Sequence, residues 1–176
     1  LPQSAVGKTI MTTEPKFVPA NAVGVQFGKM SAKVRLIDCV GYLVDGAVGH
    51  EEEGKPRMVK TPWSEENLPF EKAAEIGTAK VISEHSTIGI LITTDGSIGD
   101  IPRAGYVRPE ERVVKELKSL NKPFVIVLNT VDPTSKDALK LTKSMSDKYS
   151  APVIPINVLN MEESEINRII ETVLFE

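Results

Sequence analysis

The amino-acid sequence predicts an α/β fold in which a mostly parallel β-sheet is flanked by helices. Short apolar runs, each of strand length, alternate along the chain with longer stretches in which apolar residues recur at helical spacing. Two of these runs, 89–94 and 124–128, are apolar almost throughout, as strands covered on both faces are. The order strand, helix, strand, helix is typical of a parallel sheet with right-handed crossovers.

Five strands are expected, at residues 23–27, 34–38, 89–94, 124–128 and 153–156. The first two follow each other closely and are expected to be joined by a turn over 28–32. The last contains Pro155, which cannot donate a hydrogen bond to a neighbouring strand. We therefore expect this short strand at an edge of the sheet.

Four helices are expected from apolar stripes among charged residues, at residues 70–85, 109–120, 135–149 and 161–175. The second is expected to begin at Pro109, because proline followed by two glutamates suits the first turn of a helix. Two segments, 1–20 and 41–69, fit neither pattern and are predicted to be irregular. A loop as long as 41–69 is uncommon in a compact α/β domain and is commonly functional.

Composition and charge exclude several classes of protein. The length of 176 residues fits one domain or most of one. A net charge of −3 argues against nucleic-acid binding, which needs a basic surface. No apolar run approaches the length of a membrane span, and the single Cys39 indicates a reducing compartment. The chain starts at Leu1 rather than Met and ends at Glu176 after a helix pattern, so both ends are expected to be cut.

An aspartate and a glycine three residues apart, Asp38 and Gly41, follow the second expected strand. P-loop NTPases need an acidic residue at this place to hold Mg²⁺, which prefers oxygen ligands and keeps part of its water shell. A glycine three residues later lets a backbone N–H approach the γ-phosphate without a Cβ in the way. We interpret Asp38 as a metal-associated residue and Gly41 as a nucleotide contact. The alternative is an ordinary turn after a strand.

Two threonines, Thr12 and Thr13, lie upstream of the first expected strand. In switch-type NTPases a threonine at this place ligates Mg²⁺ and contacts the γ-phosphate, so that hydrolysis releases the loop. From spacing alone the segment reads as a polar loop. The nearby residues 7–9, Gly-Lys-Thr, resemble the end of a phosphate-binding loop, but Pro2 occupies the position of its first glycine and has no N–H. We reject 7–9 as a phosphate-binding loop.

The tetrapeptide 129–132, Asn-Thr-Val-Asp, follows the strand expected at 124–128. GTPases place Asn-Lys-x-Asp there, with the aspartate on the guanine and the lysine stem packed on the purine. Asn129 and Asp132 are therefore predicted to bind the base, with Thr130 in place of the lysine. The choice between guanine and adenine stays open. Asp95, with the next glycine, ends the strand 89–94 at the ligand-binding edge of such a sheet, but forms a common turn signal and is given no catalytic role.

Several longer stretches resemble the stage IV sporulation protein A family of endospore-forming bacteria; they are residues 1–17, 38–42, 54–58, 61–63, 73–78, 84–89 and 93–96. The resemblance covers essentially the whole chain. It implies the P-loop NTPase fold of the translation-factor-like GTPases, with ATP hydrolysis as the activity and ATP and Mg²⁺ as cofactors. Thr12 and Thr13 match the family's threonines that sense the γ-phosphate and count as catalytic. Asp38 matches its Mg²⁺-associated residue, with Thr12 as a second metal ligand.

The resemblance also implies partners and a place in the cell. In that family, hydrolysis drives assembly into a static self-polymer, the base layer of the spore coat, on the mother-cell (cytoplasmic) side of the forespore surface. A small amphipathic forespore-membrane peptide, stage V sporulation protein M, recruits the polymer, so membrane association is peripheral and runs through a partner. The polymer in turn recruits other coat and cortex morphogenetic proteins. No nucleic acid is expected.

The family's first strand and Gly-x-x-x-x-Gly-Lys-Ser loop precede the point where this chain begins. We therefore interpret residues 1–176 as a partial NTPase domain, with a switch I-like segment at 4–20 and a switch II-like segment with a long insertion at 38–69. This chain alone is expected neither to bind Mg-nucleotide tightly nor to turn it over. Two rival functions remain: a GTP-binding regulatory switch, and a non-catalytic interaction module that works through 41–69.

Overall fold

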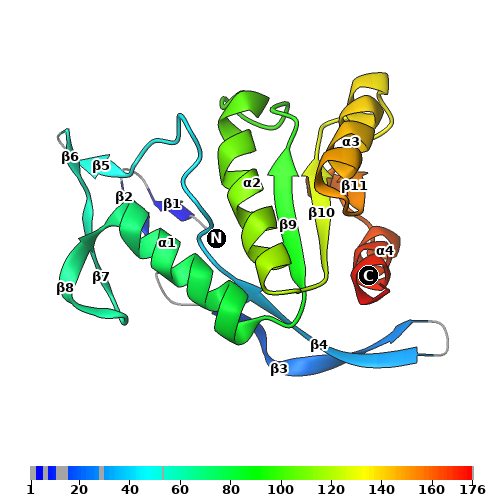
Figure 1. Cartoon of the computed structure of the whole chain (residues 1–176), viewed down its shortest axis with the longest axis horizontal. Helices are drawn as coiled ribbons and strands as arrows, with labels where there is room; N and C mark the ends of the chain where they lie inside the picture. Colours follow the sequence, from blue (N-terminus) through cyan, green and yellow to red (C-terminus); the bar gives the residue numbers. More distant parts are fainter. Residues whose placement is uncertain (1–2, 6–7, 11–15, 28–29, 53, 176) are drawn as a thin grey trace. The chain divides into compact units, whose positions relative to one another are not determined.

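The computed structural model describes residues 3–5, 8–10, 16–27, 30–52 and 54–175. The chain divides into two compact units. The first comprises Leu1–Leu43 and Ala47–Ser86, and the second comprises Val44–Gly46 and Thr87–Glu176. Figure 1 labels the elements of both.

A long antiparallel hairpin and a helix dominate the first unit (Figure 1). The hairpin pairs β3 (Lys16–Phe27) with β4 (Met30–Asp38), and its register shifts between Val18 and Val23. Both strands expected at 23–27 and 34–38 are confirmed, although both begin earlier, and β4 begins at Met30, inside the turn expected at 28–32. The helix α1 (Phe70–Lys80) continues as a short π-helical turn, η1 (Val81–His85), which confirms the helix expected at 70–85. It buries Phe70 and packs against the neighbouring strands β7 and β8.

The two segments predicted to be irregular contain short antiparallel hairpins, so that prediction was wrong. The strands are β1 (Gln3–Ala5) with β2 (Lys8–Ile10), β5 (Glu51–Glu52) with β6 (Lys55–Pro56), and β7 (Met58–Thr61) with β8 (Ser64–Pro69). They are too short and too polar for a period-two apolar pattern to show. The turn from β7 to β8 is stabilised locally, because the Trp63 N–H donates to the Thr61 hydroxyl at 3.2 Å. Lys8 lies in a strand and not at the start of a helix, which agrees with rejecting 7–9 as a phosphate-binding loop.

The second unit contains a three-stranded parallel sheet with flanking helices. Its order is β11 (Val153–Ile156), β10 (Phe124–Asn129), β9 (Gly89–Thr94), so the three strands expected there are confirmed. The central strand β10 buries residues 124–128 completely or nearly so. Pro155 lies in an edge strand of this sheet, as predicted.

The helices of this unit are α2 (Arg103–Ser119), α3 (Lys136–Tyr149) and α4 (Glu163–Leu174), and the short 3-10 helix η2 (Val158–Asn160) precedes α4. The Ser135 hydroxyl caps α3 by accepting from the Ala138 N–H at 3.2 Å. A capping box between Glu162 and Glu165 starts α4. The helices expected at 135–149 and 161–175 are confirmed. In the part of the chain that the structure describes, no helix is both long and apolar enough to cross a membrane.

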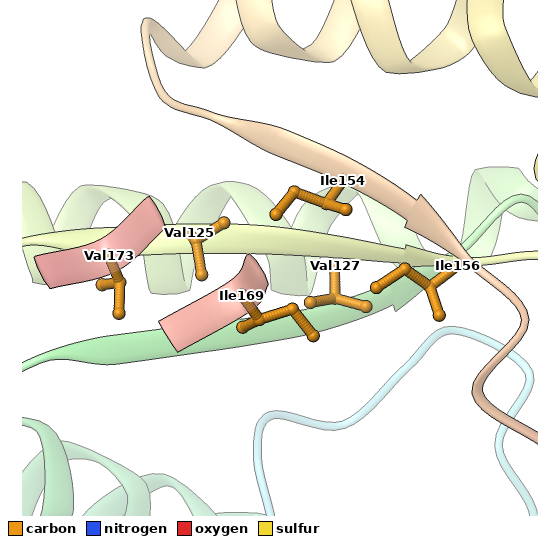
Figure 2. Close-up of a cluster of buried hydrophobic side chains, with 6 residues drawn as sticks. All are labelled: Val125, Val127, Ile154, Ile156, Ile169 and Val173. Atoms are coloured by element: carbon orange, nitrogen blue, oxygen red, sulfur yellow. The ribbon is translucent and has the colours of Figure 1, made fainter. Parts of the chain in front are cut away.

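An aliphatic cluster joins α4 to the sheet, as Figure 2 shows. Its members come from β10, β11 and α4 and are Val125, Val127, Ile154, Ile156, Ile169 and Val173. Each is at most 7% exposed. Burying a valine or isoleucine side chain stabilises a fold by about 1.5–3 kcal/mol, so this cluster is a main source of stability for the sheet edge that carries β11.

The helix expected to begin at Pro109 begins at Arg103 instead, so Pro109 lies in its interior. An interior proline lacks the N–H that would bond the carbonyl four residues earlier, here that of Gly105. The Asp45 N–H donates to this carbonyl at 3.2 Å and takes the place of the missing donor. The expectation failed because the compensating partner lies sixty residues away along the chain.

Candidate functional site

Three loops meet at the carboxyl edge of the parallel sheet. They follow β9, β10 and β11 and comprise residues 94–97, 129–132 and 156–158. Because parallel strands all end at the same edge, such loops lie side by side, and α/β sheets bind ligands there. Asn129 and Asp132, both predicted to bind a base, belong to the middle loop.

Asn129 connects the middle loop to the loop after β11. Its side-chain oxygen accepts from the Val158 N–H at 3.0 Å. The Asn157 amide donates to the Val131 carbonyl at 3.1 Å, and the Thr130 N–H donates to the Ile156 carbonyl at 3.0 Å. The side chain of Asn129 therefore braces two loops.

Thr130 occupies the position where a lysine stem would pack on a purine, but its side chain is turned into the protein. It is 1% exposed, and its hydroxyl donates to a carboxylate oxygen of Asp95 at 2.5 Å. A buried side chain with its hydroxyl engaged in this way has no surface left to stack on a base. Thr130 is a structural link between the loops after β9 and β10.

Asp95 is the acceptor at the centre of this edge. Besides Thr130, it accepts from the Ser97 N–H at 2.9 Å and the Ser97 hydroxyl at 2.5 Å. Burial raises the pKa of the Asp95 carboxyl, but the hydrogen bonds from Ser97 and Thr130 outweigh it and the net pKa is lowered. The Ser97 oxygen in turn accepts from the Val131 N–H at 3.0 Å.

The sequence alone predicts no more than a plain turn at Asp95, because an aspartate before a glycine is a common turn signal. The turn is real, since Gly96 has φ +90°. The available signal was the run of five polar or small residues, 93–97, directly after a buried strand. Such a run at the ligand-binding edge supplies several hydrogen-bonding groups at once.

Asp132 presents a carboxylate at the surface, just before α3. One of its oxygens accepts from the Thr134 N–H at 3.0 Å and the Thr134 hydroxyl at 2.7 Å. These hydrogen bonds lower the pKa of Asp132, so it is anionic at neutral pH. An exposed, oriented carboxylate can accept hydrogen bonds from the edge of a nucleobase.

Asp38 and Gly41 lie at the end of β4 in the first unit. The Asp38 side chain is exposed. Gly41 has φ +80°, and a Cβ built on it would meet no atom within 4 Å. Glycine is thus required here by backbone conformation, and the space above it is open. Thr12 and Thr13 lie outside the described residues.

Cys39, next to Asp38, has the character of a packing residue. Burial raises the pKa of its thiol, against hydrogen bonds to Gly41 and Thr78 that lower it. A thiol with a raised pKa is mostly protonated at neutral pH and is a poor nucleophile. Cys39 is therefore given no catalytic role.

A buried ion pair supports the carboxyl edge of β9. The Glu110 carboxylate accepts from Arg103 at 2.6 and 2.7 Å and from the Tyr149 hydroxyl at 2.5 Å. The same guanidinium donates to the Thr93 hydroxyl at 3.2 Å and to the Thr94 carbonyl at 3.4 Å. The cluster connects α2 and α3 to the strand end that carries Asp95.

The chain matches a family model over residues 1–176; the model is described as "Stage IV sporulation protein A, ATPase domain". Similar curated proteins, named stage IV sporulation protein A, come from Clostridioides difficile (strain 630), Bacillus anthracis and Bacillus subtilis (strain 168). They are 57%, 54% and 53% identical to the chain over its whole length. The chain spans 36% of the length of each relative. No solved structure matches it.

Proposed function

Because this chain belongs to the family of the stage IV sporulation protein A ATPase domain, we propose that it forms part of the ATP-hydrolysing domain of a spore coat scaffold. The observation that carries the proposal is the match of the family model to every residue of the chain. The relatives, more than half identical, cover the chain from end to end and support it. The fold we propose for the intact domain is that of a P-loop NTPase of the translation-factor-like branch.

The carboxyl edge of the parallel sheet is the proposed base site. Asp132 supplies an exposed anionic acceptor there, and Asn129 holds the loop that carries it. Thr130 points inward and offers no stem for stacking. A base would therefore be recognised mainly along its edge, which is compatible with adenine through its exocyclic amine.

The end of β4 is the proposed metal and phosphate site. Among the described residues no group of three His, Cys, Asp or Glu side chains could form a metal cage. Mg²⁺ usually keeps several waters and takes one or two carboxylates plus phosphate oxygens, so a single carboxylate is enough for the role proposed here. Asp38 would hold the water shell of the metal, and the open backbone at Gly41 would offer its N–H to a phosphate.

Bound Mg-ATP would supply a polarised γ-phosphate for attack by water. The residues of this chain would act by holding and orienting. Asp38 would hold the metal's waters, Thr12 or Thr13 would hold the metal and the γ-phosphate, and Gly41 would hold a phosphate oxygen. We propose that hydrolysis drives assembly of the intact protein into a polymer at the forespore surface, on the mother-cell side. The proposed partners are further copies of the protein, the peptide stage V sporulation protein M, and other coat and cortex morphogenetic proteins.

The test is hydrolysis of Mg-ATP and Mg-GTP by the full-length protein and its variants. Asp38→Asn and the double variant Thr12→Ala/Thr13→Ala are expected to lose at least about tenfold in kcat, since each removes an interaction with the metal or phosphate. Asp147→Asn, an exposed carboxylate on α3, serves as the matched control and is expected to retain activity. Preferred turnover of GTP would favour a regulatory switch. Turnover of neither nucleotide, with polymer still formed, would favour a non-catalytic scaffold.

A further inference from the structure

We propose that Asp95 is a positioning residue for nucleotide binding, which acts through Thr130 and Ser97 to hold the loop that presents Asp132 to the base. This inference rests on the proposed function and extends it to residues that the base itself would not touch. It follows from the hydrogen bonds between the loops after β9 and β10.

Two consecutive residues of the base loop are tied to the loop after β9. The Thr130 hydroxyl bonds the Asp95 carboxylate at 2.5 Å, and the Val131 N–H bonds the Ser97 oxygen at 3.0 Å. Ser97 is itself fixed by Asp95 through two hydrogen bonds, at 2.9 and 2.5 Å. Both ties therefore converge on the one carboxylate.

The strength of the link follows from its burial and charge. A short hydrogen bond to an ionised acceptor is roughly twice as strong as one between neutral groups. Thr130 is 1% exposed, so its hydroxyl would lack a water partner if Asp95 were removed. The loop cannot release Asp95 without leaving a buried polar group unsatisfied.

The turn that carries Asp95 is itself held by its neighbours in the chain and by the start of α2. The Gly96 N–H donates to the Thr94 hydroxyl at 3.1 Å, and the Thr94 carbonyl accepts from Arg103. A Cβ at Gly96 would lie 2.7 Å from the backbone nitrogen of Arg103, so the turn is packed closely against the start of α2. A rigid acceptor of this kind can fix the position of a neighbouring loop.

The consequence for binding concerns geometry. Asp132 is exposed and lies directly after the two tied residues, so its place depends on theirs. Position 130 offers no lysine stem to clamp a purine, so base recognition depends on hydrogen bonds along the edge of the base, which weaken steeply when their geometry is disturbed. Loosening the Asp95 link should weaken base recognition while leaving the phosphate contacts intact.

The experiment measures KM and kcat for ATP in the full-length protein, with inorganic tripolyphosphate as a competitive inhibitor that lacks a base. Thr130→Val keeps the shape of the side chain and removes the hydroxyl. We expect KM for ATP to rise about tenfold, in line with the loss of one charge-assisted hydrogen bond, with kcat within about threefold. The inhibition constant of tripolyphosphate should not change.

Three further variants separate positioning from folding. Thr130→Ser restores the hydroxyl and should recover most of the KM. Ser97→Ala removes the second tie at an exposed residue and should give a smaller rise in KM. Thr142→Val, on α3, removes a hydroxyl that bonds only the Ala138 carbonyl and should leave KM unchanged.

An unchanged KM in Thr130→Val, beside normal hydrolysis by the wild type, would overturn this inference alone. A parallel loss in kcat and in tripolyphosphate inhibition would also overturn it, since it would reveal a general structural defect. A wild-type protein that neither binds nor hydrolyses ATP would overturn the proposed function and this inference together.

Discussion

Among the described residues, Glu110 is the only one with a charged side chain that is buried. Each of its carboxylate oxygens accepts at least one hydrogen bond. Burial alone would raise the pKa of the Glu110 carboxyl. The hydrogen bonds from Arg103, Tyr149 and Thr93, with the positive charge of Arg103, outweigh burial, so the net pKa is lowered. Burial, and after it the hydrogen bond to Glu110, raises the pKa of the Tyr149 hydroxyl. The buried ion pair of Glu110 and Arg103 is tolerated because both carboxylate oxygens are hydrogen-bonded.

Removing one member of this cluster should be costly. Glu110→Gln leaves the Arg103 charge without its counter-ion, and we expect a loss of about 3 kcal/mol in the free energy of unfolding. Tyr149→Phe removes one hydrogen bond and should cost only about 1 kcal/mol. Urea unfolding of both variants checks the ranking. Equal losses would mean that the ion pair adds nothing beyond the tyrosine contact.

The lowered pKa of Glu110 makes stability depend on pH in a definite direction. A carboxyl with a depressed folded pKa contributes stability that is fully present above its ordinary value of 4.5 and is lost as pH falls towards the folded pKa. We expect the free energy of unfolding to decline below about pH 4.5 and the decline to be shallower in Glu110→Gln. Urea titrations between about pH 6 and 3 measure both slopes. Parallel slopes would assign the acid sensitivity to other carboxyls.

Among the elements, α2 shows most clearly how neighbours can override local rules. Gly105, in the first turns of α2, lies close to the backbone of another segment. A Cβ added there would be 2.5 Å from the backbone carbonyl oxygen of Asp45. By helix propensity alone, alanine would be better than glycine by about 1 kcal/mol. The close contact with the Asp45 backbone cancels this gain in helix propensity, because backbone atoms cannot move aside as a flexible side chain can.

Gly105→Ala should therefore destabilise the protein, by about 1–3 kcal/mol, through overpacking. Gly99→Ala is the matched control, because a Cβ there would meet nothing within 4 Å. Thermal unfolding of the two variants gives the comparison. A stabilised Gly105→Ala would show that the segment at Asp45 moves away at little cost.

Elements were predictable where burial dictated their pattern. The strand β10 is apolar because it is buried, and the stripe on α4 faces the aliphatic cluster of Figure 2. The strand β9 is apolar in sequence as well, but it is only partly covered, since Ile92 is 62% exposed. The hairpins formed by β5 to β8 escaped prediction because their short polar strands depend on turn contacts such as that of Trp63 with Thr61. The start of α2 escaped because Asp45, distant in sequence, satisfies the carbonyl that Pro109 leaves free.

The candidate site was predictable only in part, for a similar reason. Motif spacing located Asn129 and Asp132 at the carboxyl edge of the sheet, and the structure places them there. Spacing could not reveal that Thr130 turns inward to Asp95, because the two lie 35 residues apart. The base-binding roles of Asn129 and Asp132 stay predictions, as do the roles proposed for Thr12, Thr13, Asp38 and Gly41.

At the scale of the whole molecule, each unit has buried apolar residues of its own. Phe70, Ala73 and Val81 belong to the first unit, while the cluster with Val173 belongs to the second. The only tryptophan, Trp63, lies in the first unit, whereas α2, α3 and α4 lie in the second. Trp63 fluorescence thus follows the first unit, and circular dichroism follows mainly the second, because the first unit contributes only the shorter helix α1 and its π-helical turn.

Val173→Ala should lower the free energy of unfolding of the second unit by about 2 kcal/mol, since it removes buried methyl groups. Its neighbour Leu174 is 40% exposed, and Leu174→Ala should cost well under half as much. Circular dichroism in urea measures both changes, with Trp63 fluorescence as the internal reference. Equal effects of the two variants would contradict the packing of α4 described above.

The hydrogen bond from Asp45 to Gly105 has an evolutionary consequence. The donor is the backbone N–H of residue 45, which almost any amino acid can supply. Proline cannot occupy this position, because it has no N–H. Position 105 tolerates no side chain while its neighbour lies so close. Across related sequences we therefore expect position 45 to drift freely among residues other than proline. Position 105 should remain glycine wherever position 109 is proline, and should be released from that constraint only in lineages that rebuild the connecting segment.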